Sequence, residues 1–239
     1  MENIVEFKLY GKHALFTDPL TKIGGEKCTY QIPTYQALKG ILESIYWKPT
    51  IVWIIDKVRV MNRITTQTRG VKPVNYGGGN SLAIYTYLSD VEYQIQAHFE
   101  WNLNRDDMKQ DRNENKHYFV AKRMIERGGR RDVFLGTREC QGYVEPCVFG
   151  EGNGHYDDLF ELAFGLMFHG FDYPDETGKS ELQARFWRPT LVSGILGFER
   201  PEACKIRKFV RHMDKGDIAS IGLQEEELLE GYVEKEERL

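Results

Sequence analysis

A chain of 239 residues has room for one large domain or two small ones, and with 41% apolar and 13% aromatic residues it can bury a substantial core. A net charge of −4 argues at first against binding to nucleic acid. No apolar run is long enough for a signal peptide or a membrane span, so we expect a cytoplasmic protein with reduced cysteines.

The charge is unevenly distributed along the chain. Residues 224–239 hold seven Glu against two cations, whereas the other 223 residues carry 30 cations and 29 carboxylates. Residues 46–72 have six cations and one acid, and residues 105–131 have nine cations and five acids. Two basic segments in an otherwise balanced chain are typical of a protein that binds RNA or DNA.

The first 149 residues predict an α+β domain. In chain order we expect a strand over 3–9, a helix that begins after Thr34 and ends before Pro49, a strand over 50–60, a strand over 91–101, a helix within 113–131 and one or two short strands within 132–149. Between the elements, Gly11 and the stretch NYGGGN (75–80) indicate loops. This order is typical of the ferredoxin-like domains that include RNA-recognition domains.

Two periodic patterns support these elements. Residues 91–101 alternate strictly, which predicts a half-buried antiparallel strand whose inward side chains are Val91, Tyr93, Ile95, Ala97, Phe99 and Trp101. In the first helix, apolar residues recur at helical spacing after Thr34, which we expect to be the N-cap.

Residues 150–223 predict a small, mostly antiparallel β domain. It follows a glycine-rich linker over 150–154, and we expect a strand over 160–168, a turn over 172–180 and a returning strand over 181–192. The acidic tail over 224–239 forms the end of the chain.

Tyr46, Lys116 and His117 are the candidate catalytic residues. The two helices of a ferredoxin-like domain run in opposite directions, so the end of the first lies near the start of the second, and these three residues can converge there. A His beside apolar neighbours tends to stay neutral and can accept a proton, while a Lys can stabilise a developing oxyanion. We assign Tyr46, whose ordinary pKa is about 10, to positioning or hydrogen bonding.

Such a set suits one reaction, the cleavage of RNA by its own 2′-hydroxyl. A base deprotonates the 2′-hydroxyl, a cation stabilises the phosphorane and an acid protonates the leaving 5′-oxygen, which yields a 2′,3′-cyclic phosphate and a 5′-hydroxyl. The attack is intramolecular, so we expect neither a metal ion nor another cofactor. A Lys-His pair is more often a solvated surface feature, and only the convergence and the basic setting favour the catalytic interpretation.

Eight cations of the two basic segments are the candidate phosphate contacts: Lys48, Lys57, Arg59, Arg63, Arg123, Arg127, Arg130 and Arg131. The glycines of NYGGGN are either a site of close approach to a phosphate backbone or a flexible hairpin tip. The adjacent acids at 106–107 and 157–158 suggest a metal site less than they suggest helix caps or solvated loops. The four cysteines form no CxxC pair, which argues against a structural zinc site.

The segment from Gly11 to Val60 closely resembles a CRISPR-associated RAMP-superfamily protein of type I-C systems, the subunit that processes precursor CRISPR RNA where the usual dedicated processing nuclease is absent. PTYQALKGILESIYWKP (33–49) is its most specific part, and the similarity continues through GLMFHGFDY (165–173) and RFWRPTLVSGI (185–195). The resemblance implies a ferredoxin-like N-terminal domain over 1–149 and a small β domain over 150–223.

The resemblance also implies an activity. It implies metal-independent cleavage of precursor CRISPR RNA at the base of the repeat hairpin, with the family's catalytic Tyr, Lys and His falling on Tyr46, Lys116 and His117. It further implies that the protein then holds the 5′ handle and joins the backbone and large subunits of the interference complex. The alternative is a non-catalytic subunit of that complex which only binds the 5′ handle. A metal-dependent DNA nuclease is a remoter hypothesis, because no convincing carboxylate cluster is visible.

Overall fold

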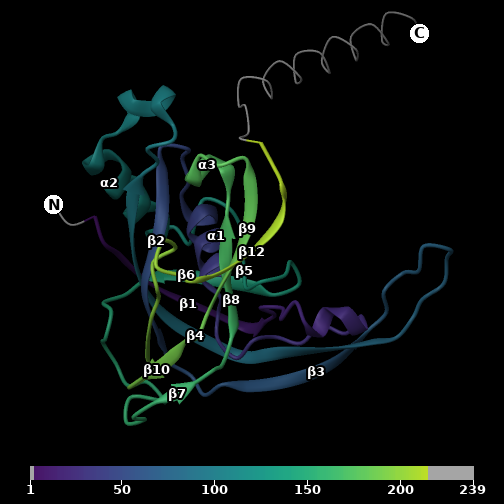
Figure 1. Cartoon of the computed structure of the whole chain (residues 1–239). Coiled ribbons are helices and arrows are strands. Elements are labelled where there is room, and N and C mark those ends of the chain that lie inside the picture. The colour runs from purple at the N-terminus through teal and green to yellow at the C-terminus, as the bar shows by residue number, and fades with distance from the viewer. Residues whose placement is uncertain (1–2, 215–239) are drawn as a thin grey trace, which may run out of the picture.

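The computed structural model of the protein describes residues 3–214 and has a mixed α+β fold, as predicted, built on two mostly antiparallel sheets (Figure 1). The predicted acidic tail over 224–239 lies outside the described residues. The elements follow one another along the chain as β1 (Val5–Ala14), η1 (Thr21–Gly24), α1 (Tyr35–Ile45), β2 (Ile51–Val60), β3 (Thr65–Val71), β4 (Ala83–Trp101), η2 (Asp106–Asp111), α2 (Glu114–Glu126), β5 (Val133–Phe134), β6 (Gln141–Pro146), β7 (Leu162–Ala163), β8 (Met167–Asp172), α3 (Pro174–Thr177), β9 (Glu181–Trp187), β10 (Thr190–Val192), β11 (Ile195–Gly197) and β12 (Ile206–His212).

The main sheet has nine strands. Eight of them lie in the order β5-β6-β1-β4-β2-β11-β10-β7, and β3 pairs with the first half of β4. At the centre, β6, β1, β4 and β2 lie side by side, so the predicted strand, helix, strand, strand, helix, strand order is present as β1, α1, β2, β4, α2 and β6. Within residues 3–214, no helix has the length and apolar character needed to cross a membrane.

One face of the main sheet is buried under α1 and α2. Helix α1 packs on β2, and α2 packs on β1 and β6. The alternation predicted for β4 is confirmed, because five of its inward side chains are almost fully buried in the same core as the helices and the sixth, Trp101, packs against it as a partly buried residue. Thr34 is the N-cap of α1, as predicted, and its hydroxyl accepts a hydrogen bond of 3.2 Å from the Ala37 amide.

Strand β1 extends beyond the loop predicted at Gly11. It pairs with β4 through Gly11 as far as Ala14. A Cβ atom at Gly11 would lie 2.6 Å from Leu135 Cδ1 and 2.8 Å from the Gln141 carbonyl oxygen. This glycine therefore permits the close approach of the β5–β6 segment to the strand and does not end it.

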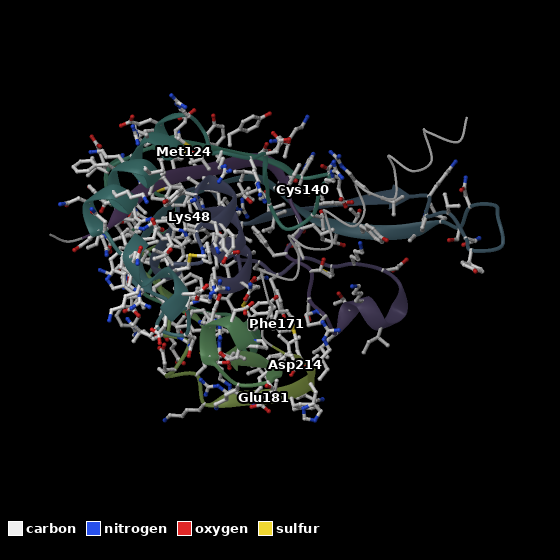
Figure 2. All side chains as sticks on the ribbon, turned by 90° about the horizontal axis from the view of Figure 1, so that it is seen from above. Lys48, Met124, Cys140, Phe171, Glu181 and Asp214 are labelled. Carbon is white, nitrogen blue, oxygen red and sulfur yellow. The ribbon has the colours of Figure 1, made fainter. Side chains whose placement is uncertain are left out.

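A long hairpin joins β3 to the first half of β4; strand β3 is missing from the predicted elements, whereas a hairpin tip is one of the two interpretations of NYGGGN. The hairpin projects away from the packed side chains of the molecule, and NYGGGN forms its tip (Figures 1 and 2). The Asn75 amide donates to the Gly79 carbonyl oxygen over 3.0 Å, and Gly78 and Gly79 adopt φ values of 87° and 76°. Only glycine adopts such angles without steric cost, so these residues form the turn. The side chains of β3 are mostly exposed and do not alternate between buried and exposed, so the sequence pattern does not predict this strand.

The predicted strands over 160–168 and 181–192 are each divided. In the first, β7 covers only Leu162–Ala163 and β8 begins at Met167; Gly165, with a φ of 74°, lies in the break between them, and Phe160 before β7 is exposed. In the second, Pro189 separates β9 from β10. Strands β8, β9 and β12 form the small sheet, whereas β7, β10 and β11 extend the main sheet beyond β2.

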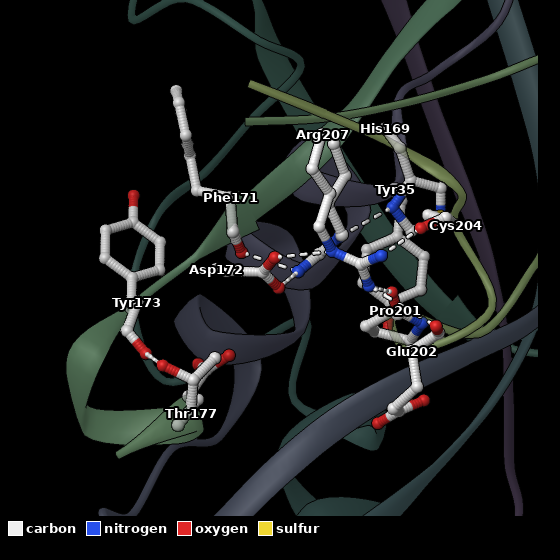
Figure 3. A network of polar contacts seen from close by, with 12 residues as sticks. Tyr35, His169, Phe171, Asp172, Tyr173, Thr177, Pro201, Glu202, Cys204 and Arg207 are labelled. Carbon is white, nitrogen blue, oxygen red and sulfur yellow. Dashed lines mark hydrogen bonds and ion pairs between the residues drawn. The ribbon is translucent and has the colours of Figure 1, made fainter. Parts of the chain in front are cut away.

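The small sheet contacts α1 through a buried polar network (Figure 3). His169 stacks on the Tyr35 ring at 4.4 Å, donates from Nε2 to the Glu199 carbonyl oxygen over 3.0 Å and accepts from Arg185 Nε over 3.3 Å. Arg185 also forms an ion pair with Asp172. Burial and the neighbouring Arg185 charge lower the pKa of His169 to about 3, so this imidazole stays neutral and serves the packing of the sheet on α1.

The opposite face of the main sheet is covered in part by the segment 150–157. Arg59 of β2 donates to both carboxylate oxygens of Asp157, over 3.1 and 2.6 Å, and to the Gly152 carbonyl oxygen over 2.8 Å. Gln94 of β4 donates to the Glu151 carbonyl oxygen over 2.7 Å. Arg59 and Gln94 are each 5% exposed, so this segment is fastened to the sheet by buried polar contacts.

We expect Asp157→Ala to lower the free energy of unfolding by roughly 2 kcal/mol. Breaking a fully buried ion pair costs about 3–5 kcal/mol, and the Asp157 side chain is still 33% exposed. The hydrogen bond from Arg59 holds the pKa of Asp157 below its usual value. This stabilisation is therefore present above the ordinary Asp pKa of about 3.9 and is lost as the pH falls below it.

Urea denaturation at pH 7 and at about pH 3 measures both effects, with the exposed neighbour Asp158→Ala as the matched control. A loss of stability at pH 7 no larger than that of the control would contradict the role assigned to this ion pair.

Candidate active site

Tyr46 is held rigidly at the end of α1. It is the C-cap residue, its amide donates to the Leu42 carbonyl oxygen over 2.8 Å, and its own carbonyl oxygen accepts 2.8 Å from Trp53 Nε1. The side chain is buried, and its hydroxyl lies 2.7 Å from Nδ1 of His117. The predicted proximity of Tyr46 and His117 is confirmed, and their catalytic role stays a prediction.

His117 lies in the first turn of α2 and is fully buried, whereas the sequence predicts a half-sheltered side chain. Its ring lies between Tyr46, Phe99 and Trp101, with ring centroids 5.7–6.0 Å away. Nε2 lies 2.8 Å from the carbonyl oxygen of Asp111. A carbonyl oxygen can only accept, so Nε2 donates to it, and in the tautomer that carries its one proton there Nδ1 accepts from the Tyr46 hydroxyl.

Asp111, the last residue of η2, joins Lys116 to this pair. Its Oδ1 forms an ion pair with Lys116 Nζ, and its Oδ2 accepts 2.8 Å from the Thr50 hydroxyl and lies 3.4 Å from His117 Nε2. Asn113 caps α2 by accepting from the Lys116 amide over 3.1 Å. The cap sets the first turn of α2 so that Lys116 and His117 both reach Asp111.

The electrostatics of the cluster follow from these contacts. The Lys116 hydrogen bond, and then that of Thr50, lower the pKa of Asp111, so the carboxylate is charged at neutral pH. Burial, and then the Asp111 charge, raise the pKa of Tyr46 to about 12, with an opposing effect from Arg130. Tyr46 is therefore a neutral phenol at neutral pH. Lys116 is half exposed and is the cation of the cluster that faces solvent.

This arrangement can move a proton between the phenol and the imidazole and can place a cation beside them. Among residues 3–214, no group of three or more His, Cys, Asp or Glu side chains is placed to hold a metal ion. The four cysteines, all within the described part of the chain, are free thiols.

Five of the predicted phosphate contacts lie on α2 or around the end of α1, and all five are exposed: Lys48, Arg123, Arg127, Arg130 and Arg131. The amides of Arg130 and Arg131 donate to the carbonyl oxygens of Ile45 and Ser44, over 3.2 and 3.1 Å. These hydrogen bonds bring the segment after α2 to the end of α1, next to Tyr46. There, Arg130, Arg131 and Trp47 line a cavity of 210 Å³.

The other three predicted contacts lie elsewhere. Lys57 is exposed on β2, roughly 20 Å along the strand from Thr50 at about 3.3 Å per residue. Arg63 is exposed in the connection between β2 and β3. Arg59 is buried, and its guanidinium is occupied by Asp157, Gly152 and Gln94. A phosphate would have to displace these partners, so we assign Arg59 to holding the segment 150–157 on the sheet and not to binding RNA.

Two residues of the cluster, Asp111 and Thr50, are absent from the sequence prediction. Asp111 belongs to the polar segment before α2, where its type alone indicates a solvated loop or a helix cap. Its carboxylate and carbonyl group turn back onto α2 because η2 ends at Asp111 and Asn113 begins the helix. The spacing of five and six residues to Lys116 and His117 carries no helical signal, so only the loop geometry reveals the contact.

A family model described as CRISPR-associated protein (Cas_Cas5) matches residues 4–199. The chain belongs to the Cas5d family. The match covers the main sheet, both long helices and the whole of the Tyr46 cluster. It ends before β12.

Two relatives whose names state an activity are each 26% identical to this chain. The chain is 26% identical over 226 residues to the CRISPR pre-crRNA endoribonuclease Cas5d of Mannheimia succiniciproducens, which covers 82% of this chain and 95% of that protein. It is 26% identical over 196 residues to the protein of the same name from Thermus thermophilus, covering 77% and 80%.

Two solved structures of the same fold have a higher sequence identity to this chain, 36%. A crystal structure of a CRISPR-associated protein matches with a TM-score of 0.73 and 36% identity, covering 86% of this chain and 96% of that one. The functionally uncharacterised protein SMU1763c from Streptococcus mutans matches with a TM-score of 0.69, the same identity and the same coverage. The similarity to Cas5d proteins in sequence, and to these solved structures in fold, thus extends over most of the chain.

Proposed function

We propose that this protein is a metal-independent endoribonuclease that cleaves precursor CRISPR RNA at the base of the repeat hairpin by attack of a 2′-hydroxyl. Two relatives are named as pre-crRNA endoribonucleases. The observation that carries the proposal is the 2.7 Å hydrogen bond between the Tyr46 hydroxyl and His117 Nδ1, with Lys116 linked to the same His117 through Asp111. A phenol bonded to an unprotonated imidazole nitrogen is a pair built to pass a proton.

In this mechanism His117 acts on the RNA through Tyr46. The imidazole is fully buried and both of its nitrogens are occupied, so a 2′-hydroxyl has no direct access to it. The 2′-hydroxyl proton passes to the Tyr46 oxygen while the Tyr46 proton passes to His117 Nδ1. A concerted transfer avoids a free phenolate, which a pKa of about 12 would make costly.

Lys116 acts on the phosphorus side of the reaction. The 2′-oxygen forms a bond to phosphorus, and the half-exposed ammonium stabilises the charge of the phosphorane. The bond from phosphorus to the 5′-oxygen then breaks, and Lys116 gives a proton to the leaving oxygen. The products are a 2′,3′-cyclic phosphate and a 5′-hydroxyl.

The RNA lies over the basic surface that surrounds the end of α1 and continues along α2. Lys48, Arg123, Arg127, Arg130 and Arg131 form this surface, and Lys57 and Arg63 contact the RNA further from the cut. The ferredoxin-like unit over 1–149 supplies both catalysis and binding, and the small β domain over 150–223 supports it. After cleavage the protein retains the 5′ handle and joins the backbone and large subunits of the interference complex, in the cytoplasm.

A second candidate function is a subunit that binds the 5′ handle without cutting it. The burial of His117 favours this candidate, because a His with two occupied nitrogens can also be a structural residue. The cluster contains a cation and a proton-transfer pair that a binding subunit does not need, which favours the nuclease.

The decisive experiment offers the wild-type protein two repeat RNAs in excess EDTA, one all-ribose and one with a single 2′-deoxy nucleotide before the scissile phosphate. We expect the ribose RNA to be cut and the deoxy RNA to be bound with equal affinity but left intact, since it lacks the nucleophile. Activity that returns only with Mg²⁺ or Mn²⁺, or cutting of the deoxy RNA at the same phosphate, contradicts the mechanism. Binding of both RNAs without cutting supports the handle-binding subunit.

Removing the phenol hydroxyl tests the relay. We expect Tyr46→Phe to slow cleavage by roughly 10²-fold or more, nearly as much as His117→Ala, because either change breaks the path from the imidazole to the RNA. Lys116→Ala should also slow cleavage, and its affinity for the deoxy RNA shows how far the same ammonium contributes to binding. Tyr35→Phe removes another buried tyrosine hydroxyl and is the control. A Tyr46→Phe protein that cuts at nearly the wild-type rate would show that His117 does not work through the phenol.

Charge removal locates the RNA. Replacing Lys48, Arg123, Arg127, Arg130 or Arg131 by Gln should weaken binding and flatten its salt dependence by roughly one counterion for each phosphate that the variant no longer binds. Lys179, exposed in the turn after α3, provides a control in which the same charge is removed elsewhere. Binding of the deoxy RNA measured from about 50 to 300 mM salt gives the slopes. Slopes equal to that of Lys179→Gln would place the RNA on another surface.

A further inference from the structure

The carboxylate of Asp111 lies at the centre of the Tyr46 cluster and has no part in the roles given so far. It contacts Lys116 through Oδ1, and Thr50 and His117 through Oδ2. Its backbone carbonyl oxygen also accepts from His117 Nε2. One residue therefore touches both the cation and the imidazole that the proposed reaction uses.

A carboxylate at this position has an electrostatic cost for an RNA-binding protein. It partly neutralises Lys116 and repels the phosphate that Lys116 is proposed to stabilise. If Asp111 were only a surface residue, its removal would therefore help RNA binding and leave the reaction unharmed or faster. Thr50 is only 1% exposed, so its side chain has few other orientations. Its hydroxyl nevertheless holds the Asp111 carboxylate in this position through a hydrogen bond.

We propose that Asp111 is a positioning residue of the nuclease, and this inference rests on the function proposed above. Its Oδ1 holds the Lys116 ammonium next to the phenol–imidazole pair. Its Oδ2, 3.4 Å from His117 Nε2, supplies the negative charge that stabilises the imidazolium formed when Nδ1 takes the Tyr46 proton. Asp111 would thus act like the Asp of a Ser-His-Asp triad, which orients the catalytic His and balances its positive charge while staying ionised.

Thr50 belongs to the same device. Its hydroxyl donates to Oδ2, and its carbonyl oxygen accepts 2.9 Å from the Asn102 amide at the end of β4. Thr50, in the connection between α1 and β2, is thereby hydrogen-bonded both to the end of β4 and to the Asp111 carboxylate. These two contacts hold the carboxylate in a fixed position relative to the main sheet.

The test measures cleavage and binding separately. Single-turnover rates on the ribose RNA report the reaction, and the affinity for the deoxy RNA reports binding. We expect Asp111→Asn to slow cleavage by roughly 10- to 100-fold, by analogy with groups that orient a metal ligand, while affinity stays equal or rises. Asp106→Asn removes the same charge from an exposed carboxylate at the other end of η2 and should leave the cleavage rate unchanged.

A double-mutant cycle with Lys116→Ala shows whether Asp111 works through the lysine. Residues that act as a unit give non-additive effects, so Asp111→Asn should slow the Lys116→Ala protein by a smaller factor than it slows the wild type. Thr50 gives a second, independent pair of variants in case Asp111→Asn folds poorly. Thr50→Ser keeps the hydroxyl and should retain the wild-type rate, whereas Thr50→Val removes it and should lose part of the rate.

The outcomes separate this inference from the proposed function. A wild-type protein that fails to cut the ribose RNA refutes the nuclease itself. A wild-type protein that cuts, with Asp111→Asn and Thr50→Val cutting equally fast, overturns only the role of Asp111. An equal loss in Asp111→Asn and Asp106→Asn, full additivity with Lys116→Ala, or a loss confined to RNA affinity would overturn it as well.

Discussion

The hydrogen bond between the Tyr46 hydroxyl and His117 Nδ1 is the contact on which the proposed mechanism depends. It joins the end of α1 to the first turn of α2 inside the core, and it engages the one imidazole nitrogen that can accept a proton. Because Phe99, Trp101 and the Asp111 carbonyl group enclose the rest of the His117 ring, the proposed mechanism passes the proton through the Tyr46 phenol. A Lys-His pair is more often a solvated surface feature. In that setting the imidazole would be neither buried nor held in one tautomer by hydrogen bonds.

The two faces of the main sheet have different tasks. One face forms the core beneath α1 and α2 and supports the Tyr46 cluster at its edge. The other is partly covered by the segment 150–157, which Arg59 and Gln94 fasten in place. RNA-recognition domains commonly stack bases on an open sheet. Here the covered part of the sheet is closed to bases, which favours a route for RNA along the helices and the segment after α2.

The acids within the basic segment 105–131 explain where its positive charge is available. Asp107 pairs with Arg105, Asp106 with Arg112 and Asp111 with Lys116. In the part of the chain that the structure describes, no ion pair engages Arg123, Arg127, Arg130 or Arg131. The carboxylates thus neutralise the η2 end of the segment and leave the α2 end and the following loop positive, so the uncompensated charge lies next to Tyr46.

Much of the architecture could be predicted from periodicity alone. The alternation in β4, the Thr34 cap and the order of β1, α1, β2, β4, α2 and β6 all follow from which side chains must be buried. The opposite directions of the two helices then bring Tyr46 towards His117, so two members of the site could be predicted before any coordinates. Strand β3 could not, because its exposed side chains carry no burial pattern, although a hairpin tip is one of the two interpretations of NYGGGN. The division of 160–168 was missed because the break at Gly165 falls within an apparently regular alternation of apolar residues.

The sequence by itself determined the class of fold, the charged segments and the residue types available for proton transfer, since these depend on local pattern and composition. The tertiary structure decided that His117 is fully buried with its Nδ1 against the Tyr46 hydroxyl, that Arg59 holds the segment 150–157, and that Asp111 bridges Lys116 and Thr50. Each of these depends on contacts between residues distant in sequence or on the exact turn between η2 and α2. Hydrogen bonds and ion pairs form between whichever groups the packed chain brings within about 3 Å, and no spacing along the chain encodes that distance.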